Sequence, residues 1–178
     1  LDALVTDRTD SGHNVIATVY VDSHANYAVD GPPHLRVVGE TRFAHAMGVE
    51  ADRRGGYARG ACAAIVSHAD LLLGAGVGEV LDAHVAASPR FRGIRHMTAF
   101  DTDLPPIYGC TEPGVMTRPL FRAGAAELAR RGLSFDAWLF HPQLSELIAL
   151  ARALPELQIA LDHVAGPIGV GRYADDRA

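Results

Sequence analysis

Histidine and aspartate side chains follow five short apolar segments of the chain, and their types suit them to chemistry. Neutral imidazole is the commonest metal ligand in proteins and titrates near neutrality. Carboxylate and imidazole can also activate water as general bases. The residues that share this position are Asp22, His24, His68, Asp70, Arg95, His96, His141, Asp162 and His163. Together they predict a site for metal ligation or proton transfer.

The apolar segments themselves have the length and composition of strands. They cover residues 14–21, 61–67, 91–95, 134–140 and 158–161. Helical patterns separate them, for example Val77, Val80, Leu81 and Val85 on one predicted helical face. Near-continuous apolar strands that alternate with amphipathic helices indicate parallel strands covered by helices. The carboxyl ends of such strands lie on one face, which is where active sites of (β/α) folds are built.

Two α/β architectures fit this alternation: an open doubly wound sheet and a (β/α)8 TIM barrel. The chain has neither a G-x-G-x-x-G after its first strand nor a G-x-x-x-x-G-K-[ST] motif, so a nucleotide-binding open sheet is disfavoured. A barrel usually needs about 250 residues. With 178 residues and no initial methionine, the sequence therefore predicts a single partial barrel domain, a fragment of a longer chain.

Composition limits the partners. The net charge is −5, and no basic stripe with interleaved aromatic residues is present, so we expect no nucleic acid. No apolar stretch approaches the roughly 20 residues of a membrane-spanning helix. Cys62 and Cys110 do not make a disulfide framework, which favours a reducing, cytoplasmic compartment. The expected partner is a small-molecule substrate, and the long loop over residues 101–117 is predicted to be either functional or disordered.

Ordinary structural roles compete with these functional ones. A single histidine at a strand end is more often a cap or a loop residue, and His141 could simply precede a helix that begins at Pro142. Side chains alternate along a strand, so only one of Arg95 and His96 should face the pocket, and only one of Asp162 and His163. The same alternation predicts that Asp136 and Trp138 face the helix layer. The remaining histidines, at 13, 34, 45 and 84, are predicted to be surface or satisfied core residues.

Four motifs resemble the amidohydrolase-related family of TIM-barrel, metal-dependent hydrolases. They begin at Gly12 (GHNVIATVYV), Phe91 (FRGIRH), Phe135 (FDAWLFHPQL) and Leu161 (LDHVAGP), in the family's order. The branch resembled includes sugar-lactone hydrolases and 2-pyrone-4,6-dicarboxylate lactonase. The resemblance implies that the five strands are the family's second to sixth. The family's first-strand His-x-His and its strand-eight aspartate, the usual general base on water, would then lie outside this chain.

The resemblance also implies roles for individual residues. His141 and His163 match the metal-binding histidines after the fifth and sixth strands, and His96 joins them as a catalytic candidate. The implied cofactor is one divalent ion, Zn²⁺ or Mn²⁺, with metal-independent catalysis as the alternative. Substrate contacts are expected from Arg95, Asp22, His24, Tyr27, His68 and Asp70.

The leading functional hypothesis is a hydrolase that opens a lactone or cyclic ester of a small carboxylic or sugar acid. A metal-dependent decarboxylase of the same fold, which would be a lyase, is the second hypothesis. The third is a catalytically incomplete fragment that only binds a ligand. The identity of the substrate and of the metal stays open, as does a homo-oligomer of the full-length protein.

Overall fold

The computed structural model describes residues 1–105 and 112–175. The chain divides into two compact units, which are treated separately below. The first comprises Leu1–His68 and Glu79–Gly93, and the second comprises Ala69–Gly78 and the residues from Ile94 onward. Strand β3 (Phe91–Met97) contributes its first residues to one unit and the others to the second.

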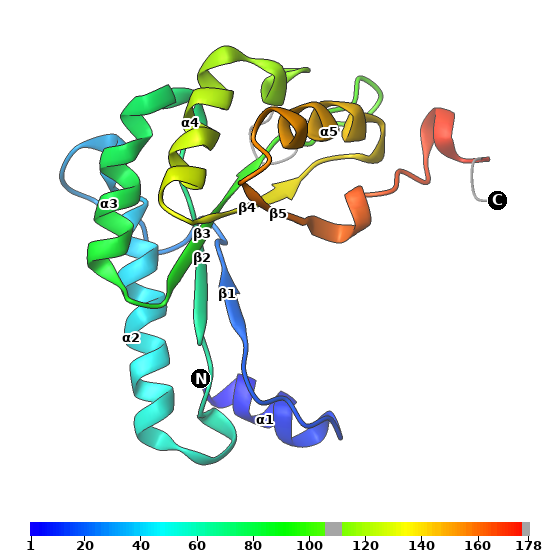
Figure 1. Ribbon diagram of the computed structural model, residues 1–178. Helices are drawn as coiled ribbons and strands as arrows, with labels where there is room; N and C mark the ends of the chain where they lie inside the picture. Colours follow the sequence, from blue (N-terminus) through cyan, green and yellow to red (C-terminus); the bar gives the residue numbers. More distant parts are fainter. Residues whose placement is uncertain (106–111, 176–178) are drawn as a thin grey trace. The chain divides into compact units, whose positions relative to one another are not determined.

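The first unit alternates helices and strands. Strands β1 and β2 are parallel, with Val19 opposite Ala64 and Val21 opposite Val66. Helix α1 lies beside the start of this unit's sheet, and α2 packs along β2 (Figure 1). The elements are α1 (Asp2–Asp10), β1 (Val19–Val21), α2 (Val38–Arg54), β2 (Ala64–His68) and most of α3 (Val77–Ala87).

The second unit also alternates helices and strands. Strands β4 and β5 are parallel, with Phe135 opposite Ile159. Helix α4 packs so closely on the 3-10 segment Leu71–Gly76 that a Cβ at Gly124 would collide with the Leu71 carbonyl oxygen. The elements after β3 are α4 (Pro119–Arg130), β4 (Ser134–Trp138), α5 (Leu144–Ala153) and β5 (Gln158–Leu161).

The five strands are hydrogen-bonded in chain order, β1-β2-β3-β4-β5. An open doubly wound sheet reverses its strand order at a switch point, whereas a (β/α) barrel adds each new strand on the same side. The observed order is that of a partial barrel, as the sequence predicted. It places the carboxyl ends of neighbouring strands at the same edge of the sheet in each unit.

Local sequence explains the helix limits. Helix α2 buries a stripe that includes Ala44, Gly48 and Ala51, and it stops at Gly55, whose φ of 69° is accessible mainly to glycine. Arg53 and Arg54 occupy its last turn, where cations complement the helix dipole. The arginine pair thus marks the end of α2.

Several details of the predicted elements are wrong. Strand β2 begins at Ala64 instead of residue 61, and β4 ends at Trp138 instead of residue 140. Strand β1 covers only Val19–Val21 instead of residues 14–21, and the carbonyl of Val15 accepts a hydrogen bond from Arg8 instead of joining the sheet. On α3, Val85 is 52% exposed and His84 is fully buried. In an α-helix, the residue seven positions after Val77 points in almost the same direction as Val77, whereas the residue eight positions after it is turned away. The buried face that includes Val77 therefore includes His84 and not Val85.

The facing of β4 is also opposite to the prediction. The ring of Phe135 packs edge-on against Phe121 of α4 at 5.8 Å between centroids. Phe135 and Ala137 therefore face the helix layer, and alternation turns Asp136 and Trp138 to the other face of the strand. The bulky aromatic ring takes the helix side because α4 offers it a closed apolar contact.

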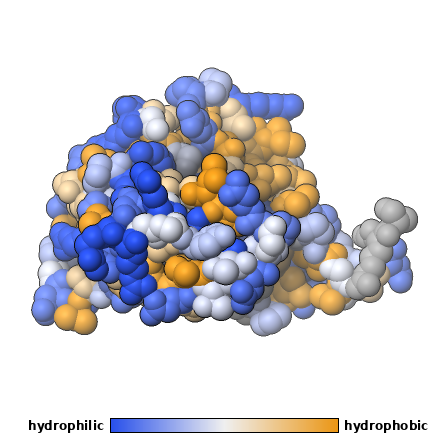
Figure 2. All heavy atoms as spheres, turned by 90° about the horizontal axis from the view of Figure 1, so that it is seen from below, coloured by the Kyte–Doolittle hydropathy of each residue, from blue (hydrophilic) through white to orange (hydrophobic). Residues whose placement is uncertain are grey.

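Apolar side chains are also present at the surface. Ile16, Val29 and Val164 are among those most exposed, and Figure 2 shows apolar and polar residues interspersed over the face it displays. In the described part of the chain, no helix has both the length and the apolar composition needed to cross a membrane. Cys62 is a free thiol, and Cys110 lies outside the described residues, as does the centre of the 101–117 loop.

Candidate functional site

In the first unit, four predicted site residues meet after β1 and β2; we call Asp22, His24, Tyr27 and His68 the β1–β2 cluster. The Asp22 carboxylate is buried, and its Oδ2 lies 3.5 Å from Nε2 of His24. The Tyr27 hydroxyl is 3.2 Å from Nδ1 of the same ring. The His24 and His68 rings are 5.4 Å apart between centroids. The structure thus brings these four side chains together, and their role as substrate contacts stays a prediction.

The hydrogen-bonding roles in the β1–β2 cluster follow from Tyr27. Burial, reinforced by the negative charges of Glu40 and Asp22, raises the pKa of Tyr27, so its hydroxyl keeps its proton. That hydroxyl can donate to Nδ1 of His24, which leaves the ring proton on Nε2, toward the Asp22 carboxylate. Both ring nitrogens of His24 are then engaged within the protein.

A buried chain of polar groups supports the end of β2. Nε2 of His84 donates to the His68 carbonyl at 3.0 Å, and its Nδ1 accepts from Thr41 Oγ1 at 2.8 Å. Thr41 also contacts Ser67 Oγ. Burial lowers the pKa of His84 to about 4, so the ring is neutral near neutrality. His84 is therefore a satisfied core histidine, as predicted.

In the second unit, Arg95 and Asp162 approach each other at the ends of β3 and β5. Nη1 of Arg95 is 4.0 Å from Oδ2 of Asp162, and both side chains are mostly buried, at 16% and 17% exposure. This ion pair links the segments at the ends of β3 and β5. Of the pair Asp162 and His163, the aspartate is thus the residue that faces Arg95.

His96 has a different set of contacts. Its Nδ1 accepts a hydrogen bond of 3.1 Å from the Leu71 backbone N–H, and its ring lies edge-on to Phe121 of α4. The Asp70 carboxylate caps the 3-10 segment by accepting from Leu72 N and is 3.9 Å from the His96 ring nitrogen. Of the pair Arg95 and His96, the histidine is the one that packs against α4. The catalytic role of His96 and the substrate contact of Asp70 stay predictions.

His141 is fixed from two sides. Its Nδ1 accepts a hydrogen bond of 3.2 Å from the Ile168 backbone N–H, and its ring lies edge-on to Tyr173 at 5.0 Å. Since an amide N–H can only donate, the neutral ring carries its proton on Nε2. His141 therefore presents a hydrogen-bond donor at Nε2.

Sequence reasoning missed the residues that hold Tyr173. The Asp101 carboxylate accepts from the Tyr173 hydroxyl at 3.1 Å, from Arg172 at 2.6 Å and from the Asp103 backbone N–H at 2.9 Å. The amide bond from Asp103, with the bonds from Tyr173 and Arg172, holds the pKa of Asp101 below its usual range. Asp101 lies in the loop that follows β3. This position in the sequence was the only signal that could have singled it out.

His163 lies in an unusual turn. His163, Val164 and Ala165 all have positive φ, between 51° and 61°. The His163 side chain is exposed and edge-on to Trp138, at 6.1 Å between ring centroids. The strand ends at Leu161, where the predicted fifth strand also ends, and this turn follows it.

The described residues do not by themselves form a complete site for a divalent ion. Across residues 1–105 and 112–175, no three His, Cys, Asp or Glu side chains converge in a way that could hold a metal. Ligation by Nε2 of His141 would require the proton on Nδ1, where it would face the Ile168 N–H. The metal role implied for His141 and His163 stays a prediction, and no catalytic step below depends on a metal.

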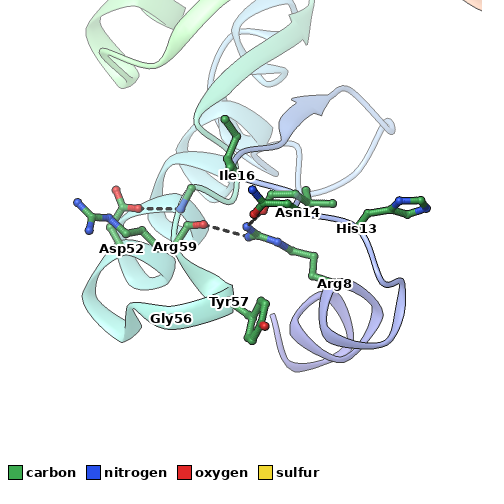
Figure 3. A pocket seen from close by; sticks show the side chains of 10 residues that line it. Arg8, His13, Asn14, Ile16, Asp52, Gly56, Tyr57 and Arg59 are labelled. Atoms are coloured by element: carbon green, nitrogen blue, oxygen red, sulfur yellow. Dashed lines mark hydrogen bonds between the residues drawn. The ribbon is translucent and has the colours of Figure 1, made fainter.

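A cavity of about 500 Å³ lies at the opposite end of the first unit's strands. Figure 3 shows Arg8, Tyr57 and Ile16 among its lining residues, with Arg8 donating to the Arg59 carbonyl at 3.0 Å. The cavity is formed by residues that precede β1 and β2. It is therefore remote from the carboxyl ends of these strands, where (β/α) enzymes place their chemistry.

Comparisons with known proteins agree with the partial-barrel fold. The model of a family described as amidohydrolase matches residues 17–176. The uncharacterised protein y4mH of Sinorhizobium fredii is 46% identical over 87 residues, which are 49% of this chain and 29% of that protein. L-fucono-1,5-lactonase of Burkholderia ambifaria is 32% identical over 91 residues, 51% of this chain and 28% of the lactonase. The chain thus spans less than a third of either relative in these matches. No solved structure gives a significant match.

Proposed function

Because this chain belongs to the amidohydrolase family, we propose that it is the part of a hydrolase that binds and polarises a lactone or related cyclic ester. The similarity to a protein named L-fucono-1,5-lactonase makes a sugar-acid lactone the first substrate class to test. The observation that carries the proposal is the hydrogen bond from Ile168 N–H to His141 Nδ1.

The proposed role of His141 follows from that bond. When water attacks a lactone carbonyl, negative charge develops on the carbonyl oxygen, and a donor already directed at this oxygen stabilises the transition state. His141 presents Nε2–H and is held on one side by Ile168 and on the other by the Tyr173 ring. A donor fixed in this way needs no reorganisation during the reaction.

Arg95 is the proposed anchor for the substrate's carboxylate or hydroxyl oxygens. Its guanidinium lies 4.0 Å from the Asp162 carboxylate at the ends of β3 and β5, and its planar fork of N–H groups suits the recognition of carboxylate and lactone oxygens. Within the first unit, the polar side chains of the β1–β2 cluster are proposed as further substrate contacts. The resemblance assigns activation of water to an aspartate after the family's eighth strand, so we assign that step to the rest of the protein.

The experiment uses the complete protein that contains this chain. It is incubated with L-fucono-1,5-lactone and with other sugar-acid and aromatic-acid lactones, and acid release is followed with a pH indicator. The assay is run as purified, after chelation, and after addition of Zn²⁺ or Mn²⁺. We expect lactone opening, with kcat/KM reduced roughly tenfold or more in Arg95→Lys, because an ammonium cannot reproduce the guanidinium fork.

Arg92→Lys is the matched control. Arg92 lies on the same strand, is exposed, and donates only to nearby backbone carbonyls. This variant should hydrolyse the lactone like the parent protein. If no lactone is opened under any metal condition, the proposal is wrong. Release of CO₂ from a muconate-type acid, without lactone hydrolysis, would replace it with the lyase hypothesis.

A further inference from the structure

We infer that Glu40 is a positioning residue that holds His24 in place from beneath the loop after β1. The effect of this role on turnover rests on the proposed function. The contacts of Glu40 that define the role do not depend on that function. Glu40 lies in the first turn of α2 and is 1% exposed, whereas the His24 side chain above it is 34% exposed.

The key contacts are two backbone amides on either side of His24. Oε1 of Glu40 accepts from Ser23 N at 2.8 Å and from Ala25 N at 3.3 Å. His24, between them, has a φ of 55°, in the left-handed region that non-glycine residues seldom adopt. Successive N–H groups around a left-handed residue form a concave site for an anion. The Glu40 carboxylate fills this site from inside the protein.

Two side-chain hydroxyls strengthen the arrangement. The same Oε1 accepts from Tyr20 Oη at 2.7 Å and from Ser23 Oγ at 2.9 Å. Burial raises the pKa of Tyr20 to about 12, so this phenol remains a donor through the working pH range. Four donors thus converge on one carboxylate oxygen. Such convergence favours a single position of the loop over the alternatives.

The consequence for His24 is a fixed ring direction. An unusual backbone conformation persists only where its surroundings over-determine it, and here Glu40 supplies that constraint. With the backbone held, the imidazole extends to Asp22 on one side and Tyr27 on the other. Loss of the carboxylate should release the left-handed turn, so the ring would leave these two partners.

A packing role makes a different prediction from a positioning role. If Glu40 only filled space, an apolar side chain of similar size would serve as well, because the position is buried. If Glu40 holds the amides, only a side chain with an acceptor oxygen can replace it. Glu40→Leu removes every acceptor, and Glu40→Gln keeps one that is neutral.

The test compares both variants in the complete protein. NMR spectra report the amide signals of Ser23 and Ala25 and the ring nitrogens of His24, which are assigned with His24→Gln. We expect these signals to move in Glu40→Leu and to move less in Glu40→Gln. We also expect kcat/KM for the lactone to fall about a hundredfold and about tenfold, respectively, since hydrogen bonds to charged groups are among the stronger ones.

Ser88→Ala is the control for loss of a buried hydroxyl elsewhere in the same unit. Ser88 is 1% exposed and contacts His45 and the Arg90 backbone, so its loss should leave kcat/KM within about twofold. The inference is overturned if a folded Glu40→Leu protein keeps the parent signals at residues 23–25. If Glu40→Leu does not fold, unchanged signals in Glu40→Gln overturn it instead. The NMR result stands even if no lactone is hydrolysed, so failure of the proposed function is distinguishable.

Discussion

The backbone N–H of Ile168 donates to Nδ1 of His141 over 3.2 Å, and this one contact determines which ring nitrogen carries the proton. The neutral imidazole becomes a donor at Nε2, which is the opposite of what a metal ligand or a general base needs at that atom. The contact joins the segment after β4 to the segment after β5, so the ring state depends on the packing of both.

Replacing His141 by asparagine or by glutamine tests the contacts of its two ring nitrogens separately. Asparagine places an oxygen near the position of Nδ1 and can accept from Ile168, but it has no donor near Nε2. Glutamine reaches the Nε2 position with an amide donor and loses the Ile168 contact. We expect His141→Asn to lose about 100-fold in kcat/KM with little change in stability, and His141→Gln to lose about 1 kcal/mol of stability and less activity. Kinetics and urea unfolding of the complete protein measure both, and equal activities in the two variants would contradict the donor role.

Gly39→Ala is expected to destabilise the protein, although replacing glycine by alanine usually stabilises a helix. A Cβ there would lie 2.5 Å from the Asn26 carbonyl oxygen and 2.6 Å from Ala28 N, both backbone atoms of the loop that carries His24. Alanine in a helix is normally better than glycine by about 1 kcal/mol, but Gly39→Ala should lower the free energy of unfolding by about 1–3 kcal/mol. Gly76→Ala is the control, because no atom lies within 4 Å of its Cβ position. Thermal unfolding that shows the same shift in both variants would argue against the close approach.

His84 should make stability depend on pH in a defined window. Its pKa falls from 6.5 to about 4 because the ring is buried. Between these values the unfolded chain binds more protons than the folded one, so stability rises with pH and is lost as pH falls from 6.5 toward 4. The contribution reaches roughly 3 kcal/mol at most. Urea unfolding at about pH 7 and about pH 4.5 should show a smaller difference in His84→Gln than in the parent protein, and equal differences would refute the assignment.

Val164 is a candidate for stabilisation. It is 80% exposed and has a φ of 53°, which a β-branched residue adopts only under strain. Val164→Gly should relieve that strain, whereas Val170→Gly changes an exposed valine with a φ of −137° and has nothing to relieve. We expect the first variant to be the more stable by about 1 kcal/mol in thermal unfolding. The reverse order would show that the turn at His163 is not strained.

Structural features that depend on residues close together in the sequence were predictable. The alternation of strands and helices follows from apolar periodicity, and it led to a partial barrel with Asp22, His24 and His68 after the first two strands. Details that depend on a distant partner were less predictable. The facing of Asp136 and Trp138 was predicted the wrong way round, since it is decided by the contact of Phe135 with Phe121.

The sequence by itself therefore determined the alternating architecture and which residue types gather at the strand ends, because strand and helix periods and chain order are local properties. Only the tertiary structure decided what those residues can do. The proton of His141 is placed by Ile168, Arg95 faces Asp162, and the turn at His24 is held by Glu40. Each of these contacts joins residues far apart in the chain, so it arises only when packing brings a specific donor to a specific acceptor.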